Sequence, residues 1–294
     1  MKLTAVVQSI RVPFLVLTPV CVFLGASTVA TCETNISLLL LVLLGALLAH
    51  ISVNALNEYS DFKSGLDLTT TRTPFSGGSG ALPGNPEMSV AVFAAGAVSL
   101  MAALVIGGYF VWKYGAGIVP IGVAGLILIV TYTDWINRFP FLCLIAPGIG
   151  FGFLMVVGTQ FVLQGEYAPL SLLVAVVPFF LVNNLLLLNQ YPDIEADASV
   201  GRNHFPIAYG VSRSNLAYAI FALATSAIIV IYVLLGYLPA MSFIALLPMP
   251  LAFLALYGAI KYRENIGNYP HYLGANVGVA ILTPLLLGLS IMIG

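Results

Sequence analysis

Residues 36–67 read ISLLLLVLLGALLAHISVNALNEYSDFKSGLD, an apolar segment that runs directly into a polar one. The segment 36–57 is predominantly apolar over about 20 residues, the length that a helix needs to cross the hydrocarbon core of a bilayer. Glu58, Asp61 and Asp67 follow it. The stretch therefore predicts a membrane-spanning helix that ends in an acidic segment at one surface of the membrane.

The whole chain has the composition of an integral membrane protein. Of its 294 residues, 60% are apolar and 7% are charged, whereas about 25% of residues are charged in an ordinary soluble domain. This composition excludes a soluble globular protein and a disordered chain. The 10 Lys and Arg residues against 11 Asp and Glu residues leave a net charge of −1, so no basic field is present that could bind nucleic acid.

Apolar runs of similar length recur along the chain and predict an all-α, polytopic fold with nine transmembrane helices in a single domain, residues 1–294. The expected spans are 12–31, 36–57, 88–111, 117–134, 139–163, 170–189, 216–235, 240–260 and 272–292. The first run has one alternative reading as a secretory signal peptide, because Lys2 and Arg11 precede it. The eight spans that follow favour a retained helix.

The basic residues predict the orientation of the bundle. With a cytoplasmic N-terminus, nine of the 10 Lys and Arg residues fall on the cytoplasmic side, and Lys113 alone falls outside. Nine of the 11 acidic residues lie on the cytoplasmic side as well, which the orientation rule does not explain. We therefore expect a multi-pass protein of the inner (cytoplasmic) membrane whose functional site faces the cytoplasm.

The first acidic segment carries polar residues at helical spacing. Asn57 and Asp61 are four positions apart and Asn54 lies one turn earlier, so the three share one face of a helix. Gly65 is expected to end this helix and to let the chain bring Asp67 back beside Asp61.

The second acidic segment repeats this pattern after the run 170–189. Asn189, Asp193 and Asp197 recur every four positions, which predicts one amide and two carboxylates along a single helix face. Clustered carboxylates repel each other unless a cation lies between them, and Mg²⁺ prefers oxygen ligands and bridges carboxylates to phosphate oxygens. The two segments together predict a Mg²⁺ site for a phosphate-bearing substrate, with the ligands Asp61, Asp67, Asp193, Asp197 and Asn57.

Charged neighbours of these aspartates divide into two groups. Lys63, Arg72 and Arg202 lie next to the acids and are expected to contact phosphate oxygens. Glu58 and Glu195 point off the helix face that carries the aspartates, so we expect both to be solvated.

At these residues the sequence resembles the UbiA superfamily of intramembrane prenyltransferases. Members of that family have nine helices, with aspartate-rich motifs after helices 2 and 6, and the order and spacing here are similar. The six-position step from Asp61 to Asp67 and the Lys-x-Gly insert between them look like the menaquinone branch, which prenylates 1,4-dihydroxy-2-naphthoate.

The resemblance implies Mg²⁺-dependent transfer of a prenyl group from a polyprenyl diphosphate to a small aromatic acceptor, in menaquinone biosynthesis. It implies Asp61, Asp67, Asp193 and Asp197 as the catalytic residues. The implied substrate-binding residues are Arg11, Asn54, Asn57, Lys63, Arg72, Tyr132, Asn189 and Arg202. Two of these keep a simpler reading, Arg11 as a positive-inside anchor and Tyr132 as a residue of the interfacial aromatic belt.

Three alternatives remain at this point. The acceptor could be 4-hydroxybenzoate or a related ring, or the protein could be a UbiA-like membrane terpene cyclase that quenches the cation within its own chain. A transporter is disfavoured, because transporters place ionisable groups near the bilayer midplane and these acids lie at one interface.

Overall fold

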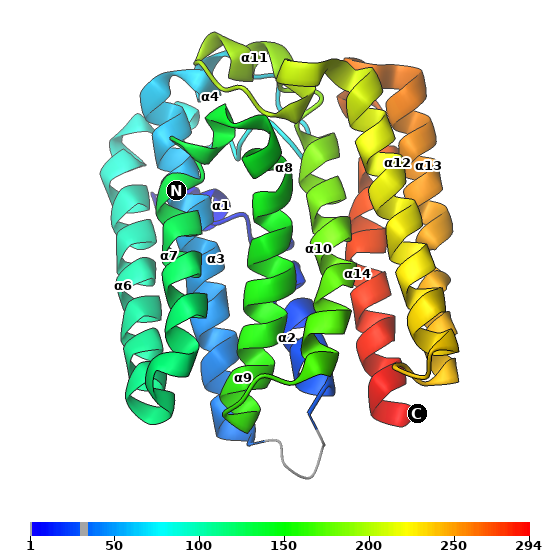
Figure 1. Cartoon of the computed structure of the whole chain (residues 1–294). Coiled ribbons are helices and arrows are strands. Elements are labelled where there is room, and N and C mark those ends of the chain that lie inside the picture. The colour runs from blue at the N-terminus through cyan, green and yellow to red at the C-terminus, as the bar shows by residue number, and fades with distance from the viewer. Residues whose placement is uncertain (1, 30–34) are drawn as a thin grey trace.

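The computed structural model describes residues 2–29 and 35–294, and every regular element within them is a helix. The long helices run side by side as a bundle, with short helices and loops across one end (Figure 1). The all-α prediction is confirmed. The expected end of the first span, residue 31, lies outside the described residues.

Helices of three kinds make up the bundle. The longest are α3 (Ile36–Ser64), α6 (Ser89–Tyr114), α10 (Pro169–Asn189), α12 (Phe205–Leu234) and α14 (Pro270–Ile293). Shorter helices beside them are α2 (Leu17–Ser27), α7 (Val119–Thr131), α8 (Pro140–Gly148), α9 (Gly158–Gln164) and α13 (Met249–Tyr262). The remaining short helices are α1 (Lys2–Ser9), α4 (Leu66–Thr69), α5 (Ala81–Gly84) and α11 (Ile194–Ser199).

Several connections are tighter or wider helical turns. A π-helix, η6 (Ile149–Val157), joins α8 to α9. The 3₁₀ segments near the bundle are η1 (Val12–Val16), η3 (Pro86–Met88), η4 (Gly115–Ile118), η5 (Ile136–Arg138), η7 (Ala240–Leu246) and η8 (Arg263–Asn268).

Within the described residues, seven helical segments are long and apolar enough to cross a membrane. They are Ile36–Ser64, Pro86–Thr131, Pro140–Gln164, Pro169–Asn189, Phe205–Leu234, Ala240–Asn268 and Pro270–Ile293, and a shorter apolar helix covers Val12–Ser27. Nine spans are expected from the sequence. The segment Pro86–Thr131 is 46 residues long and contains both α6 and α7, which run in opposite directions on either side of η4 (Figure 1).

The outward faces of these helices are apolar. On α6, Val98 is 67% exposed and Val105 is 69% exposed. Contiguous apolar surface of this kind is unfavourable in water and favourable in lipid. The prediction of a multi-pass membrane protein is supported by these faces and by the seven apolar segments.

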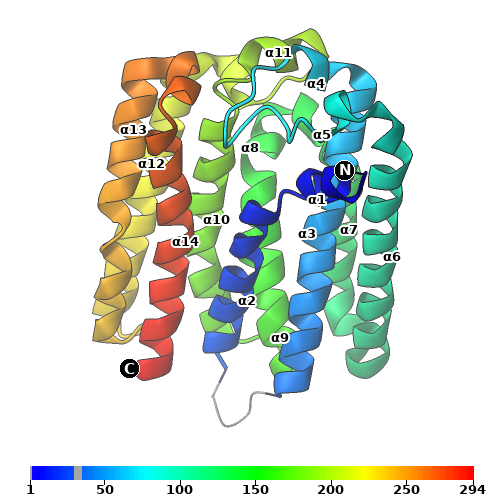
Figure 2. The same cartoon turned by 180° about the vertical axis from the view of Figure 1, so that it is seen from behind.

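The first acidic segment folds as the sequence predicts. α3 continues past the apolar run to Ser64 and ends at Gly65, which has a φ of 83°. This left-handed conformation favours glycine, because a side chain would meet the following carbonyl oxygen. α4 starts at the next residue and carries Asp67 across the end of the bundle, beside the end of α3 (Figure 2).

The second acidic segment differs from its prediction. α10 ends at Asn189 and α11 begins at Ile194, so the continuous helix expected from Asn189 to Asp197 is interrupted. Pro192 lies in the break, where it cannot donate the hydrogen bond that a continuing helix requires. α11 therefore turns across the end of the bundle, close to α4 (Figures 1 and 2).

Buried amides connect α10 to three neighbouring helices. The Asn183 Oδ1 atom accepts a hydrogen bond of 2.6 Å from the Gly148 N–H in α8. Asn184 donates to the Tyr218 carbonyl of α12 at 3.0 Å, and Asn276 of α14 donates to the Asn184 carbonyl at 3.0 Å. Hydrogen bonds of this kind hold helices together in lipid, where apolar packing adds no hydrophobic driving force.

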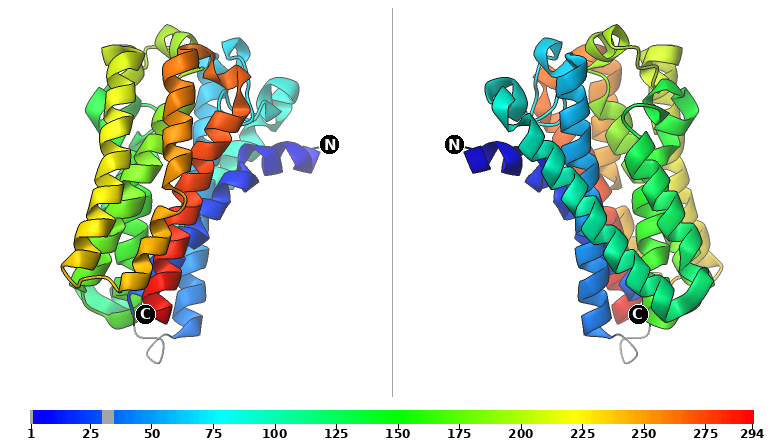
Figure 3. Two further views of the ribbon diagram at one scale, coloured as in Figure 1. Left: turned by 90° about the vertical axis from the view of Figure 1, so that its right-hand side faces the viewer. Right: turned by 90° about the vertical axis from the view of Figure 1, so that its left-hand side faces the viewer.

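The N-terminal helix α1 packs against α3, α5 and α6 but does not run along the bundle. It projects sideways from it, near the end that carries α4, α5 and α11 (Figure 3). The turn between α1 and η1 therefore brings residues 10 and 11 toward the first acidic segment.

Candidate active site

One cavity of about 740 Å³ lies inside the bundle. Its polar end is lined by residues of both acidic segments and of the α1–η1 turn, namely Arg11, Asn54, Asn57, Asp61, Asp67, Asn189, Asp193, Asp197, Arg202 and His204. Along α3 the lining runs from Asp61 to Val42, about 28 Å of helix at 1.5 Å per residue. The cavity therefore connects the acidic end of the bundle to its apolar interior.

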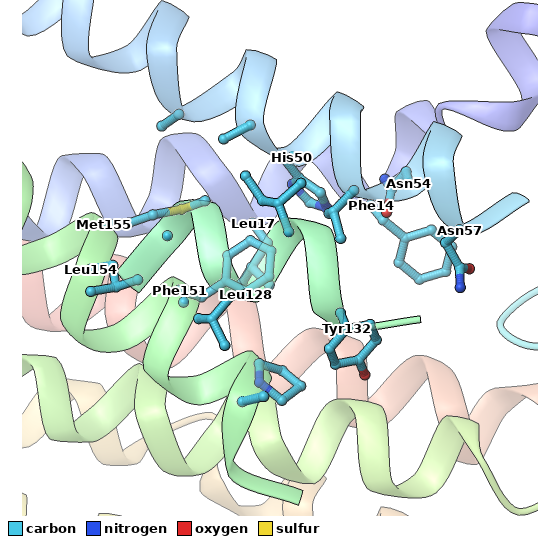
Figure 4. Close-up of a pocket in the computed structure, with 18 of the residues that line it drawn as sticks. Phe14, Leu17, His50, Asn54, Asn57, Leu128, Tyr132, Phe151, Leu154 and Met155 are labelled. Carbon is cyan, nitrogen blue, oxygen red and sulfur yellow. The ribbon is translucent and has the colours of Figure 1, made fainter. Parts of the chain in front are cut away.

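The interior part of the cavity is apolar. Figure 4 shows Asn57 and Tyr132 toward one end of the pocket and Leu154 and Met155 toward the other. His50 lies between them, and its Nδ1 atom is 2.8 Å from the Thr18 hydroxyl. A ligand that fills this cavity would have a polar head and a long apolar tail.

Three oxygen atoms at the polar end lack a partner. Asp67 Oδ2, Asp193 Oδ1 and Asn189 Oδ1 are buried and accept no hydrogen bond. Burial, as the main cause, raises the pKa of both carboxyl groups to about 7. Buried oxygens without a donor are costly unless a cation or a ligand donor reaches them.

These oxygens fit Mg²⁺ bound together with phosphate. In the described part of the chain, no three His, Cys, Asp or Glu side chains group closely enough to hold a metal ion on their own. Mg²⁺ is usually held by one or two carboxylates, with water and substrate phosphate completing its shell. Asp67, Asp193 and the neutral oxygen of Asn189 supply such a partial set.

Arg202 bridges the two acidic segments. Its Nη2 atom donates to Asp61, and its Nη1 atom donates to Asp197 at 2.7 Å. The oxygens of Asp61 and Asp197 that face this guanidinium are therefore engaged, whereas Asp67 Oδ2 and Asp193 Oδ1 have no partner. Arg202 also lines the cavity, so the direct phosphate contact expected of it stays a prediction beside these two ion pairs.

His204 completes the surroundings of Asp197. Its Nε2 atom lies 3.0 Å from the second carboxylate oxygen of Asp197. Burial by itself would raise the pKa of Asp197, but the hydrogen bond from His204 and the charge of Arg202 outweigh it and lower the pKa below its usual value. The sequence offered one signal for His204, its place directly after the second acidic segment.

Arg11 reaches the first acidic segment from a strained turn. It has a φ of 53°, which is unfavourable for a residue with a side chain. Asn54 supports the turn by donating to the Ile10 carbonyl at 3.0 Å. Arg11 Nη2 lies 3.4 Å from Asn57 Oδ1 and 3.3 Å from Glu58 Oε2. The oxygen expected from Asn57 as a metal ligand is therefore engaged with Arg11.

Two predicted phosphate contacts lie outside the cavity lining. Lys63 is exposed, with its Nζ atom 5.6 Å from the centre of the Tyr59 ring. It lies two residues after Asp61, about 200° around the helix, and so faces away from the cavity. Arg72 is exposed as well, and it donates to the Asp67 carbonyl at 2.9 Å, where it holds the backbone of the loop.

The two glutamates of the acidic segments, Glu58 and Glu195, differ in solvent exposure. Glu195 is exposed, as expected. Glu58 was expected to be solvated and is instead 0% exposed, because the chain between α4 and α5 folds over the helix face that carries it.

Residues 73–80 of this connection form a glycine-rich loop, the glycine loop. The Gly77 N–H donates to Asp193 Oδ2 at 3.0 Å. A Cβ atom at Gly78 would lie 2.6 Å from Asp67 Oδ1, so the close approach of Asp67 requires glycine. The loop thus contacts both aspartates that keep an oxygen without a partner. Its glycine-rich sequence was visible beforehand, but the partners of its backbone were not.

A model of the UbiA prenyltransferase family matches residues 17–272 of the chain. No curated protein sequence matches it. Among solved structures, a UbiA homologue from Archaeoglobus fulgidus bound to DMAPP and Mg²⁺ superposes with a TM-score of 0.71 at 13% identity, over 98% of both chains. The same homologue bound to GPP and Mg²⁺ gives a TM-score of 0.69 at 12% identity, over 98% of this chain and 99% of that one.

A digeranylgeranylglyceryl phosphate synthase also shares the fold, with a TM-score of 0.66 at 14% identity over 99% of both chains. At such identities these likenesses concern the fold. The family model, in contrast, covers well over half of the sequence and both acidic segments. The chain therefore belongs to the UbiA prenyltransferase family.

Proposed function

We propose that the protein transfers a prenyl group from a polyprenyl diphosphate to an aromatic acceptor such as 1,4-dihydroxy-2-naphthoate, in the menaquinone pathway. The observation that carries this proposal is the continuity of the cavity. Unengaged oxygens of Asp67, Asp193 and Asn189 lie at its polar end, and its apolar part extends along α3 as far as Val42. This shape suits a diphosphate with a long hydrocarbon tail.

Mg²⁺ is the metal that we propose for the polar end, and the A. fulgidus homologue bound to DMAPP and Mg²⁺ supports it. When bound, the ion supplies neutralisation of the charge that builds on the diphosphate as the allylic C–O bond breaks. Asp67 and Asp193, with Asn189, would hold it. Arg202 keeps Asp61 and Asp197 in place between the two segments.

The second half of the reaction joins the allylic carbon to a ring carbon of the acceptor, and the ring then loses a proton or carbon dioxide. Tyr132 lines the cavity where the polar end meets the apolar part (Figure 4). The face of an aromatic ring attracts a cation, so Tyr132 is suited to stabilise the allylic cation before it reacts. The apolar lining of the interior part offers few partners to the water that would otherwise capture this cation.

For the membrane topology we propose nine crossings. The segment Pro86–Thr131 would cross twice, since it contains the antiparallel helices α6 and α7. Val12–Ser27 and each of the other six segments would cross once. The asymmetry of basic residues supports a cytoplasmic N-terminus, in the inner membrane, with the acidic segments facing the cytoplasm.

The acceptor is tested by product analysis. Purified protein with Mg²⁺ and geranylgeranyl diphosphate is offered 1,4-dihydroxy-2-naphthoate, 4-hydroxybenzoate or no acceptor, and the products are identified by mass spectrometry. We expect a prenylated naphthalene. Prenylated 4-hydroxybenzoate would reassign the acceptor, a hydrocarbon formed without acceptor would indicate a terpene cyclase, and intact diphosphate in all three would contradict the proposal.

The affinity for Mg²⁺ is expected to rise with pH. The carboxyl groups of Asp67 and Asp193 have pKa values raised to about 7, so below that pH both carry protons that a metal ion must displace. The Mg²⁺ concentration for half-maximal activity should therefore fall between about pH 6 and about pH 8. An Asp193→Asn variant removes one of the two titrating groups, so its half-maximal Mg²⁺ concentration should depend less on pH. A pH dependence as steep as that of the wild type would contradict this explanation.

Chain-length selection is expected to respond to Gly125 in α7. Gly125 lines the cavity, and a Cβ atom there would lie 3.8 Å from Leu154 in the π-helix, so a larger side chain has room to enter the apolar part. Gly125 lies seven residues before Tyr132, about 10 Å along the helix axis. Gly125→Phe should therefore keep activity with geranyl diphosphate and lose most of it with geranylgeranyl diphosphate.

The matched control for this substitution is Val105→Phe, which adds the same ring to the outer face of α6, away from the cavity lining. It should leave the ratio of the two activities unchanged. Equal losses with both substrates in Gly125→Phe would show that the tail does not pass this point.

A further inference from the structure

Glu58 is the most completely enclosed carboxylate near the site, and its partners come from two distant parts of the chain. The Ser79 N–H donates to both of its oxygens, at 3.2 and 3.1 Å, and the Ser79 hydroxyl donates to Oε1. Arg11 Nη2 lies 3.3 Å from Oε2. Glu58 is 0% exposed. One side chain of α3 therefore binds both the glycine loop and the turn after α1.

The partners of Glu58 link α3 to the segments that line the cavity. A buried carboxylate keeps its charge only where an ion pair and hydrogen bonds replace its water. Both replacements come from segments that line the cavity, Arg11 directly and Ser79 through its neighbours in the glycine loop. The backbone between Gly77 and Ser79 is short, so fixing Ser79 also fixes Gly77.

The glycine loop then acts on the aspartates. The Gly77 N–H occupies one oxygen of Asp193 at 3.0 Å and leaves the other, Oδ1, without a partner. Gly78 packs against Oδ1 of Asp67, whose Oδ2 is also without a partner. The loop thus holds Asp193 by a hydrogen bond and lies close against Asp67, while Asp193 Oδ1 and Asp67 Oδ2 remain available.

We propose that Glu58 is a positioning residue for the diphosphate site, which holds the glycine loop through Ser79 and the turn through Arg11. This inference rests on the proposed function, because it takes the available oxygens of Asp67 and Asp193 to be those that meet the metal–diphosphate group. Without the anchor, the loop leaves Asp193 and the two carboxylates lose their common orientation.

The test compares Glu58→Gln with Glu195→Gln, the same change at an exposed glutamate in the other acidic segment. Binding of geranylgeranyl thiolodiphosphate, a slowly reacting analogue, is measured by calorimetry at saturating Mg²⁺. Loss of a residue that orients a metal ligand costs about 10- to 100-fold in metal affinity or activity. We expect a loss of this size in analogue binding for Glu58→Gln and no change for Glu195→Gln.

A second measurement separates positioning from a purely structural role. Hydrogen exchange of the Gly77 and Ser79 amides should be faster in Glu58→Gln, whereas the amides of α12 should keep their protection. Ser79→Ala should weaken binding less than Glu58→Gln, and the double variant should be no weaker than Glu58→Gln, because both changes remove the same contact. If Glu58→Gln does not fold, Ser79→Ala provides the same comparison at a half-buried position.

The two proposals fail in different ways. If the wild-type protein binds the analogue with Mg²⁺ and Glu58→Gln binds it equally well, even with a lowered melting temperature, the role of Glu58 is overturned and the proposed function stands. If the wild-type protein binds no analogue at all, the proposed function fails, and with it the inference.

Discussion

Replacing Asp193 by asparagine should reduce prenyl transfer by about 100- to 1,000-fold, the loss typical of removing one group that stabilises charge in a transition state. The change is nearly isosteric, so the side-chain oxygen can still accept from the Gly77 N–H. What is lost is the charge of the oxygen that has no protein partner. The measurement is the initial rate as a function of Mg²⁺ concentration, with prenyl diphosphate saturating.

The stability of this variant should stay close to that of the wild type. Burial raises the pKa of Asp193 to about 7, so the folded protein already accommodates an uncharged group at this position. The control is Asp134→Asn, which changes an exposed aspartate at the same end of the bundle, where Asp134 accepts from the Ser60 hydroxyl at 2.6 Å. It should keep its rate. Full activity in Asp193→Asn would remove Asp193 from the site.

Replacing Arg202 by glutamine is expected to destabilise the protein by about 3–5 kcal/mol, the usual cost of removing one partner from a buried ion pair. The Arg202 side chain is 14% exposed, and the carboxylates of Asp61 and Asp197 are 7% and 6% exposed, so water can replace little of the lost charge. Activity should fall as well, because the two segments lose their bridge. Denaturant unfolding in detergent measures the first effect.

Two further variants make this result specific. Arg138→Gln changes an exposed arginine at the same end and should shift the unfolding free energy by less than about 0.5 kcal/mol. Arg202→Gln combined with Asp197→Asn should recover part of the lost stability, since it removes the charge of one of the two carboxylates that lose their Arg202 partner. A single Arg202→Gln variant as stable as the wild type would show that the ion pairs contribute nothing.

Much of the fold could be predicted because its signals are local. Apolar runs mark the spans, since a bilayer requires a fixed length of apolar helix. Gly65 ends α3 as predicted, because its left-handed backbone depends on one residue and its neighbours. The break at Pro192 also had a local signal, the proline itself. The four-residue spacing of Asn189, Asp193 and Asp197 instead led to the prediction of a continuous helix.

The positions of the aspartates were predictable for the same reason, but the state of each carboxylate was not. Arg202 and Asp61 are 141 residues apart in the chain, and no spacing rule connects them. Once they meet, Asp61 and Asp197 are engaged, whereas Asp67 and Asp193 keep an available oxygen. Lys63 and Arg72 lie next to the acids in sequence and outside the cavity in space.

The sequence by itself determined that this protein is an all-helical membrane protein of the UbiA type, with two acidic segments, because composition and helical spacing act over short distances along the chain. Only the tertiary structure decided which charges meet. The helical spacing predicted a solvated Glu58. In the structure it is the buried anchor of the glycine loop, because another segment folds over it. In a bundle with so few charges, the energy of each depends on the partner that packing brings within hydrogen-bond distance.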